Sequence, residues 1–213
     1  RNNRMGIIKV NFSEVFNNKI KILFQNESIK INEQDLAIPN QTHSSNVQFV
    51  TKPGIYNNTD GLVTSKDYNL KLSTKVADCV PIYLYDSKNN FYGLVHSGWK
   101  GTKNHIILNA LEIFKKKGSS NFKNIQVFIG PHIRSCCYEV DWDVAKYFSF
   151  FSKNKKLKKW FLSLEKEIIF DCISKGILNE NIIVSKICTF DNKQCESFRR
   201  DGHKSKRMLG VIG

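Results

Sequence analysis

Short apolar runs alternate with polar, Asn-rich segments through the first half of the chain, a pattern typical of β-strands joined by tight connections. In residues 70–76, "LKLSTKV", every second position carries an apolar residue or Thr, so one face of this strand is expected to be buried. Two stronger runs follow, "VPIYLYD" at 80–86 and "FYGLVH" at 91–96, and the polar "SKNN" between them predicts a hairpin. The other strands expected in this half lie at 7–12, 20–24, 29–31, 46–50 and 60–65, with a turn at 51–59.

The period of the apolar residues changes after residue 101. Apolar side chains recur at i, i+3, i+4 and i+7 from Ile107 to Phe114, which predicts a helix that ends near "KKKGSS". Strands are expected at 125–130, "IQVFIG", and, as the last one, at 181–185. From Asp143 to about Gly176 the pattern again indicates a helix, with the lysine-rich segment 153–160 on its solvated face. The apolar stripe expected on this helix consists of Phe161, Leu164, Ile168 and Cys172.

Hairpins together with few helices predict an α+β fold. The 213 residues contain no internal repeat and no low-complexity linker, so one domain spanning residues 1–213 is expected. The chain begins with Arg rather than Met, and we therefore expect the natural N-terminus to lie upstream. No apolar stretch approaches the roughly 18 residues of a membrane helix, and no secretion signal is recognisable. A soluble, cytoplasmic protein that does not bind membranes is expected.

Composition narrows the function classes. A hydrophobic fraction of 41% excludes disorder of the whole chain, and six cysteines without a CxxC pair predict reduced thiols rather than a disulfide scaffold. The formal net charge of +14 raises the question of nucleic-acid binding. However, 27 of the 33 basic residues are Lys, which are spread along the chain, whereas bidentate recognition favours Arg. Specific nucleic-acid binding is not expected, and a basic module that holds a ligand or polyanion remains one hypothesis.

Cys79 and His96 stand at the two ends of the predicted hairpin, and His43 lies in a polar loop just before a strand. Two imidazoles and one thiolate form a tripod that suits Zn²⁺, and three protein ligands with an open fourth position are typical of catalytic zinc. Such an ion lowers the pKa of bound water to about 7. The plainer alternative, which the spacing alone favours, is a buried cysteine at a strand end and two unrelated loop histidines.

Two further hypotheses use neighbouring residues. Cys79 as nucleophile and His96 as base would form the dyad of a metal-free cysteine hydrolase or amidase, since the hairpin places them nearly opposite each other. In "GPHIRSCCYEV", residues 130–140, two adjacent thiols beside Arg134 would line a pocket after a sharp Gly-Pro turn. A tight loop with one buried and one half-buried cysteine is the alternative that the residues alone favour there.

Several of these segments occur together in one known family. "QTHSSNV", "DGLVT", "ADCVPIYLYD", "GLVHSGWKGT", "IGPHIRSCCYEV", "CT" and "SFRRDG" follow one another in the order seen in the laccase-domain family. From about residue 40 to its C-terminus the chain resembles this family, which is also called multicopper polyphenol oxidase and whose members have been described as purine nucleoside phosphorylases. "ADCVPI" and "HSGWKG" are the most specific of the matching motifs.

The resemblance implies layered mixed β-sheets flanked by helices, similar to the cysteine hydrolase fold of the cytotoxic-necrotising-factor type. It also implies zinc, or else Cu²⁺, on His43, Cys79 and His96, with Cys79 and His96 as catalytic residues. The implied activity is zinc-dependent cleavage of adenosine, inosine and S-methyl-5'-thioadenosine with phosphate, together with adenosine deamination. Copper-dependent polyphenol oxidation is the alternative, although five histidines are too few for the copper cluster of true laccases. The substrate-binding residues expected for a purine nucleoside and phosphate are Trp99, Lys100, Arg134 and Arg199.

Overall fold

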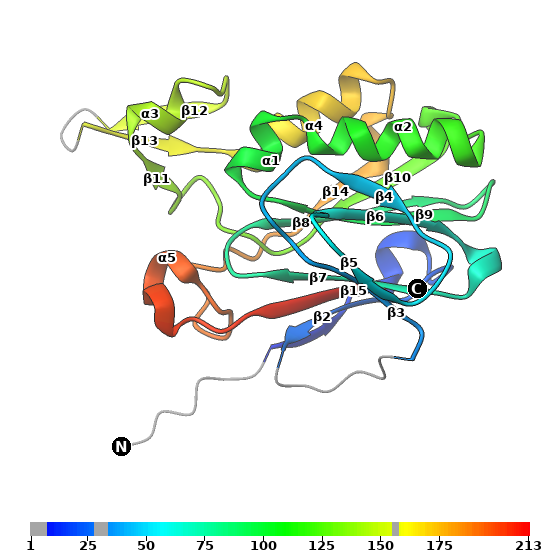
Figure 1. Ribbon diagram of the computed structural model, residues 1–213. Helices are drawn as coiled ribbons and strands as arrows, with labels where there is room; N and C mark the ends of the chain where they lie inside the picture. Colours follow the sequence, from blue (N-terminus) through cyan, green and yellow to red (C-terminus); the bar gives the residue numbers. More distant parts are fainter. Residues whose placement is uncertain (1–7, 28–33, 155–157) are drawn as a thin grey trace.

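Two six-stranded sheets pack face to face, and helices cover the outer face of the second sheet (Figure 1). The structure is a computed structural model, and it describes residues 8–27, 34–154 and 158–213. Layered sheets with few helices form the α+β fold that the sequence pattern predicts. The first sheet contains, in order across it, β1 (Lys9–Asn11), β2 (Ile22–Asn26), β15 (Met208–Ile212), β7 (Lys71–Val76), β3 (Leu36–Pro39) and β5 (Gly54–Tyr56).

The second sheet lies in the middle of the molecule and contains the predicted hairpin. Its strands β8 and β9 pair antiparallel, with Pro81 opposite His96 and Asp86 opposite Phe91. Every residue of both strands is buried because the first sheet covers one face and the helices cover the other. This sheet contains, in order, β14 (Ile182–Val184), β10 (Ile125–Ile129), β8 (Val80–Asp86), β9 (Phe91–Ser97), β6 (Gly61–Ser65) and β4 (Val47–Phe49).

Two apolar cores separate the layers. Between the sheets, Tyr83, Tyr92 and Phe128 are among the large buried side chains. Between the second sheet and the helices, the predicted face from Ile107 to Phe114 is buried, which confirms the helix expected there. No helix in the described part of the chain is long and apolar enough to cross a membrane. The α-helices are α1 (Trp99–Lys103), α2 (Ile106–Gly118), α3 (Trp142–Ala145), α4 (Leu164–Ser174) and α5 (Phe198–Asp201).

The single helix expected from Asp143 to about Gly176 is wrong. A small third sheet interrupts it, in the order β11 (Glu139–Val140), β13 (Lys159–Leu162) and β12 (Phe151–Asn154). The described residues of the lysine-rich segment, 153–154 and 158–160, therefore lie in or next to β12 and β13 and not on a helix face. Ser163 caps the N-terminus of α4 by accepting from the Lys166 backbone N–H, so Phe161 precedes the helix and does not belong to its apolar stripe.

Two further expectations differ from the structure, and a third cannot be compared with it. The predicted turn at 51–59 contains the short strand β5, which pairs parallel to β3, and β3 itself was not expected. The expected strand at 29–31 lies outside the described residues. β14 is not the last strand, because β15 runs between β2 and β7 in the middle of the first sheet. The short 3₁₀ helices are Ser13–Phe16, Lys66–Tyr68, Phe122–Asn124, Asn179–Asn181 and Gly202–Lys204.

Gly210 of β15 allows the two sheets to approach each other. A Cβ atom at this position would lie 2.5 Å from the Tyr83 hydroxyl of the second sheet. We therefore expect Gly210→Ala to lower the free energy of unfolding by about 2 kcal/mol through overpacking. Tyr83→Phe removes the clashing oxygen, so the double variant is expected to lose less than the sum of the two single variants in urea denaturation. Strict additivity, or a neutral Gly210→Ala, would contradict this packing.

Candidate metal centre

Three segments at one edge of the two sheets bring His43, Cys79 and His96 together. His43 lies in the loop after β3, Cys79 directly precedes β8, and His96 is near the end of β9. One ligand atom from each of the three lies within 4.8 Å of the other two. His43 Nε2 is 4.0 Å from Cys79 Sγ, and the two imidazole rings meet edge to face with centroids 4.8 Å apart. We call these three side chains the tripod.

Asp60, which directly precedes β6, positions both histidines of the tripod. Its buried carboxylate accepts hydrogen bonds from the backbone N–H groups of Thr42, His43 and Ser44 at 2.8–3.1 Å and from the Ser44 hydroxyl at 2.7 Å. His96 Nδ1 lies 2.8 Å from the same carboxylate. The loop needs this support because His43 has a left-handed backbone, with φ of 59°. A single side chain therefore fixes two of the three tripod residues.

Electrostatics within this group stabilise the charged forms. Burial alone would raise the pKa of Asp60, but hydrogen bonds from His96 and Ser44 outweigh it and hold the pKa well below its usual range. Ionised Asp60 therefore stabilises the folded protein above about pH 4, and this contribution is lost as the pH falls toward its lowered pKa. Burial also disfavours the charged forms of Cys79 and His96. The interaction with His96 nevertheless lowers the pKa of the Cys79 thiol to about 6. The same interaction, together with the hydrogen bond to Asp60, raises the pKa of the His96 imidazole to about 9.

The donor set of the tripod fits a zinc ion. Asp60 occupies Nδ1 of His96 and leaves Nε2 for a metal, the arrangement that orients many metal-binding histidines. Gly98 leaves room beside the group, because a Cβ atom there would lie 3.0 Å from Cys79 Sγ and 3.2 Å from His43 Cδ2. His96 is buried, Cys79 is half-buried and His43 is exposed, so the group opens to solvent on one side. Two imidazoles and a thiolate with such an opening match a three-ligand zinc site.

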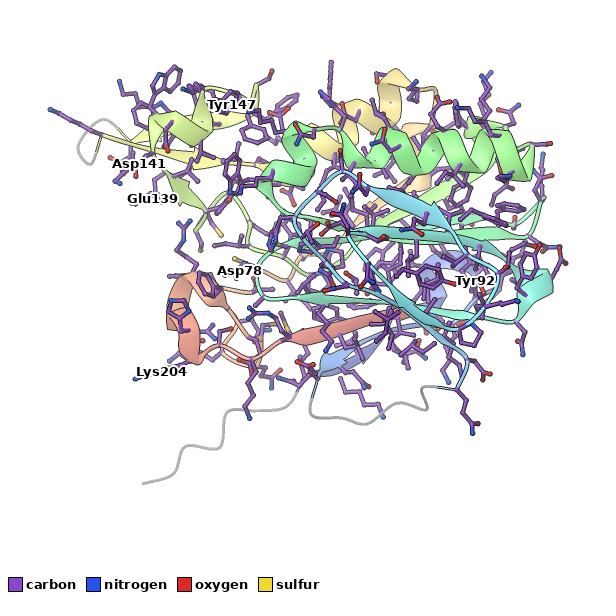
Figure 2. The ribbon with its side chains drawn as sticks, in the orientation of Figure 1. Asp78, Tyr92, Glu139, Asp141, Tyr147 and Lys204 are labelled. Carbon is purple, nitrogen blue, oxygen red and sulfur yellow. The ribbon has the colours of Figure 1, made fainter. Side chains whose placement is uncertain are left out.

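Two clefts meet at the tripod. The first cleft, of about 570 Å³, runs from His43 and Cys79 toward the small third sheet, and Trp99, Tyr138 and Arg199 line it. Its wall also carries several carboxylates, among them Asp78, Glu139 of β11 and Asp141, which follows β11. In Figure 2, Glu139 and Asp141 lie close to each other near the third sheet, and Asp78 lies below them in the view. The second cleft, of about 840 Å³, is lined by all three tripod residues and by Gln41, Lys75 and Arg207, among others.

The residues expected to bind substrate divide into two groups. Trp99 and Arg199 line the first cleft beside the tripod. Lys100 lines neither of the two clefts, and its ammonium lies 5.7 Å from the centroid of the Trp99 ring. Arg134 lies at a separate cleft and forms an ion pair with Glu165 at 3.2 Å.

Two aspartates that matter for the site's geometry were not expected from the sequence. Asp60 was recognised only as the first residue of a strand. Asp78, which adopts φ of 85°, accepts hydrogen bonds from the hydroxyls of Thr189 and Ser197 and from the Arg199 backbone N–H. Asp78 thereby attaches the C-terminal segment to the residue next to Cys79. Asp78 directly precedes Cys79 in the sequence, and this was the signal available for it. Asp60 is 17 positions from His43 and 36 from His96, so it gave no local signal.

The fold and the tripod define the class of this protein: layered α+β sheets that carry a His, Cys, His group able to hold a metal ion. The chain belongs to the family described as multi-copper polyphenol oxidoreductase laccase, whose model matches residues 13–213. This match confirms the family that the sequence motifs indicated.

Curated relatives and solved structures agree with this family. The chain is 35% identical over 186 residues to a purine nucleoside phosphorylase of Clostridium acetobutylicum, covering 85% of this chain and 78% of the relative. It is 31% identical over 198 residues to purine nucleoside phosphorylase YlmD of Bacillus subtilis, covering 84% of this chain and 71% of the relative. The crystal structure of hypothetical protein YfiH of Bacillus licheniformis matches with a TM-score of 0.85 and 25% identity over 100% of this chain and 98% of that one. The likeness to cytotoxic-necrotising-factor hydrolases stays a prediction.

Loss of the Asp60 charge is expected to weaken metal binding. We expect Asp60→Asn to reduce zinc affinity about 10- to 100-fold, because His96 and the His43 loop lose the group that orients them. The free energy of unfolding should fall by about 3 kcal/mol, since a buried, hydrogen-bonded charge pair is broken. Asp86→Asn is the matched control, because Asp86 is also buried and accepts backbone N–H groups, but at the far end of the β8–β9 hairpin. Equal zinc affinity in the two variants would contradict the role of Asp60.

The thiol of Cys79 is expected to ionise early in the metal-free protein. Its pKa of about 6 predicts that iodoacetamide alkylation rises with pH through about 6 and levels off above it, because the thiolate is the reactive form. Cys136 serves as an internal control, since desolvation of its thiol and the Cys188 thiol raise its pKa above the ordinary value, although its side chain is exposed. Peptide mass spectrometry after timed alkylation resolves the two. If Cys79 were alkylated only at the higher pH at which Cys136 reacts, this would contradict a pKa of Cys79 lowered by His96.

Proposed function

We propose that this protein is a zinc-dependent purine nucleoside phosphorylase that acts on adenosine, inosine and S-methyl-5'-thioadenosine and also deaminates adenosine. The observation that carries the proposal is the tripod, a group able to hold a metal ion at the junction of two clefts. Two clefts that meet at one point suit a reaction between two small substrates. The curated relatives named purine nucleoside phosphorylase support the same reaction class.

The first cleft has the chemistry to hold the nucleoside. Trp99 and Tyr138 offer aromatic surfaces to a purine ring. Asp78, Glu139 and other carboxylates on its wall can accept hydrogen bonds from ribose hydroxyls and from an exocyclic amine. The same carboxylates disfavour a phosphate dianion there, although Arg199 also lines the cleft. The guanidinium of Arg199 lies 5.2 Å from the Tyr138 ring centroid and donates to the Glu139 carbonyl, which leaves it a positioning role beside the base.

The second cleft has the chemistry to hold phosphate. Lys75 and Arg207 line it, and neither Asp nor Glu does among the residues that the structure describes. A phosphate bound there would lie beside the tripod, because His43, Cys79 and His96 all line this cleft. Its oxygen would form the new bond to C1′ of the ribose while the bond from C1′ to the purine nitrogen breaks, and the purine takes up a proton as it leaves. The basic residues would neutralise the phosphate charge during this exchange.

The tripod residues and Asp60 have separate tasks in this reaction. A bound Zn²⁺ supplies Lewis acidity and lowers the pKa of water to about 7, the property that deamination needs. His96 is held at Nδ1 by Asp60, so its Nε2 keeps one direction throughout the reaction. Tyr138 is buried, and burial raises the pKa of its hydroxyl, so this group stays a neutral hydrogen-bond donor at the cleft wall.

One observation favours a second candidate, a metal-free cysteine hydrolase. Asp60, His96 and Cys79 form a series of carboxylate, imidazole and thiol in which Asp60 orients His96. His96, with a further contribution from His43, lowers the pKa of Cys79. This is the arrangement of a cysteine nucleophile with its base and orienting acid. His43 has no necessary task in that mechanism, whereas it is a ligand in the zinc mechanism.

Turnover of adenosine with phosphate tests the proposed function. Zinc-loaded protein is expected to release adenine in the presence of phosphate and inosine in its absence, as followed by liquid chromatography. His43→Ala should lose the zinc ion of the tripod and both activities. Retention of activity by His43→Ala or by chelated protein, with loss in Cys79→Ser, would favour the cysteine hydrolase instead. Oxidation of a phenol by the Cu²⁺-loaded protein, without nucleoside turnover, would favour the polyphenol oxidase.

Removal of Arg207 from the second cleft is expected to weaken the binding of phosphate but not of adenosine. Arg207→Ala should raise the KM for phosphate about tenfold, the loss of one charge-assisted hydrogen bond, and leave the KM for adenosine nearly unchanged. Lys204→Ala is the matched control, because Lys204 is an exposed basic residue of the same C-terminal segment that lines neither cleft (Figure 2). A rise in the KM for adenosine rather than for phosphate would reverse the assignment of the clefts.

A further inference from the structure

A second group of metal-ligating side chains lies away from the tripod. Cys136 and Cys137 belong to the loop between β10 and β11, and Cys188 belongs to the segment that follows β14. The three sulfur atoms all lie within 4.8 Å of one another, with Cys136 Sγ 3.1 Å from Cys137 Sγ and 3.7 Å from Cys188 Sγ. We call these residues the thiol cluster, and the chemistry of the tripod does not use them.

The backbone holds the two segments of the thiol cluster in place. His132 and Cys188 form a parallel bridge, in which the Thr189 N–H donates to the His132 carbonyl at 3.0 Å. The Cys137 N–H donates to the Arg134 carbonyl at 2.9 Å, which closes a tight turn that brings both adjacent thiols to the same side. The Arg134 N–H itself points at Cys188 Sγ at 3.5 Å. The sulfurs therefore converge because of fixed main-chain contacts and not through long, freely rotating side chains.

A disulfide does not account for three converging thiols. Cys136 and Cys137 are neighbours in the chain, and a trans peptide sets their Cα atoms about 3.8 Å apart, below the roughly 4.4 Å that a disulfide requires. A bond between Cys136 and Cys188 would leave Cys137 as an unused third thiol. Two thiolates bound to Zn²⁺ at about 2.3 Å with tetrahedral angles lie about 3.8 Å apart, close to the separation of Cys136 and Cys188.

We propose that Cys136, Cys137 and Cys188 form a second metal site, one that takes a thiophilic cation such as Zn²⁺ or Cu⁺. Thiolate ligands select these soft cations over Mg²⁺ or Ca²⁺. The site opens into its own cleft of about 560 Å³, which Cys136 and Cys188 line, so an ion can enter from solvent and a water molecule can complete four-coordination of Zn²⁺.

The thiol cluster joins two segments that build the first cleft. The loop that carries Cys136 and Cys137 continues into Tyr138 and Glu139 on the cleft wall. The segment that carries Cys188 continues into Thr189, whose hydroxyl donates to Asp78 at 2.7 Å. An ion bound to the cluster would clamp these segments together, the task of a structural metal site. The proposal concerns residues distinct from the tripod and does not depend on the proposed reaction.

Cobalt stoichiometry of the unaltered protein and three variants tests the second site. Metal-free, fully reduced protein is titrated with Co²⁺ under anaerobic conditions, and sulfur-to-cobalt charge-transfer absorption and bound metal are recorded. Two ions per chain are expected for the unaltered protein. Cys136→Ser should retain one ion and lose most of the charge-transfer absorption, whereas His43→Ala should retain one ion and keep most of it. Cys172→Ala is the matched control, because Cys172 is buried away from both groups, and it should still bind two ions.

Two results would contradict the second metal site. One ion per chain that His43→Ala abolishes and Cys136→Ser leaves unchanged would restrict metal binding to the tripod. A Cys136–Cys188 disulfide in freshly isolated protein, found by mass spectrometry of unreduced peptides, would replace the metal site by a redox pair. One ion per chain that Cys136→Ser abolishes and His43→Ala leaves unchanged would contradict zinc binding by the tripod and support the metal site at the thiol cluster. Competition of bound Co²⁺ with Zn²⁺ and with Cu⁺ then identifies the preferred cation.

Discussion

The hydrogen bonds to one buried carboxylate organise the candidate site. Asp60 directly precedes β6, and it accepts from three successive backbone N–H groups of the His43 loop as well as from His96. Burying a carboxylate is costly unless its oxygens are satisfied, so the loop and the imidazole must stay where they are for Asp60 to remain buried. This constraint explains how an exposed loop with a left-handed histidine can keep a fixed position beside the sheet edge.

The layered architecture places this carboxylate where it can act. The second sheet is covered on both faces, so every residue of β8 and β9 is buried, and the polar residues of the site gather where these strands end. Cys79 and His96 lie at such an end on neighbouring strands, and the loop that carries His43 crosses the same edge. The two clefts that meet at the tripod differ in charge, with carboxylates on the wall of the first and Lys75 and Arg207 on the wall of the second. That difference is the physical basis for assigning nucleoside and phosphate to separate clefts.

The sequence was informative where a pattern is local and strong. The hairpin of residues 80–97 and the apolar face of α2 follow from periodicity, and the tripod residues stood at predicted strand ends. Asp60 was missed because it acts on residues 16–18 positions before it and 36 positions after it, contacts that only the tertiary structure creates. The helix predicted over 143–176 failed because the apolar spacing across Phe161 and Leu164 spans a strand end and a helix start. β15 was missed since a short apolar run at the chain end gains its pairing from two distant strands.

The proposed function requires a metal ion held by two imidazoles and one thiolate. X-ray absorption at the zinc edge measures this directly, with Cys136→Ser protein loaded with one Zn²⁺ per chain so that the thiol cluster does not compete. One sulfur at about 2.3 Å together with nitrogen ligands at about 2.0–2.1 Å is the predicted first coordination shell. A shell without sulfur, or one with two or more sulfur ligands, would contradict zinc binding by His43, Cys79 and His96.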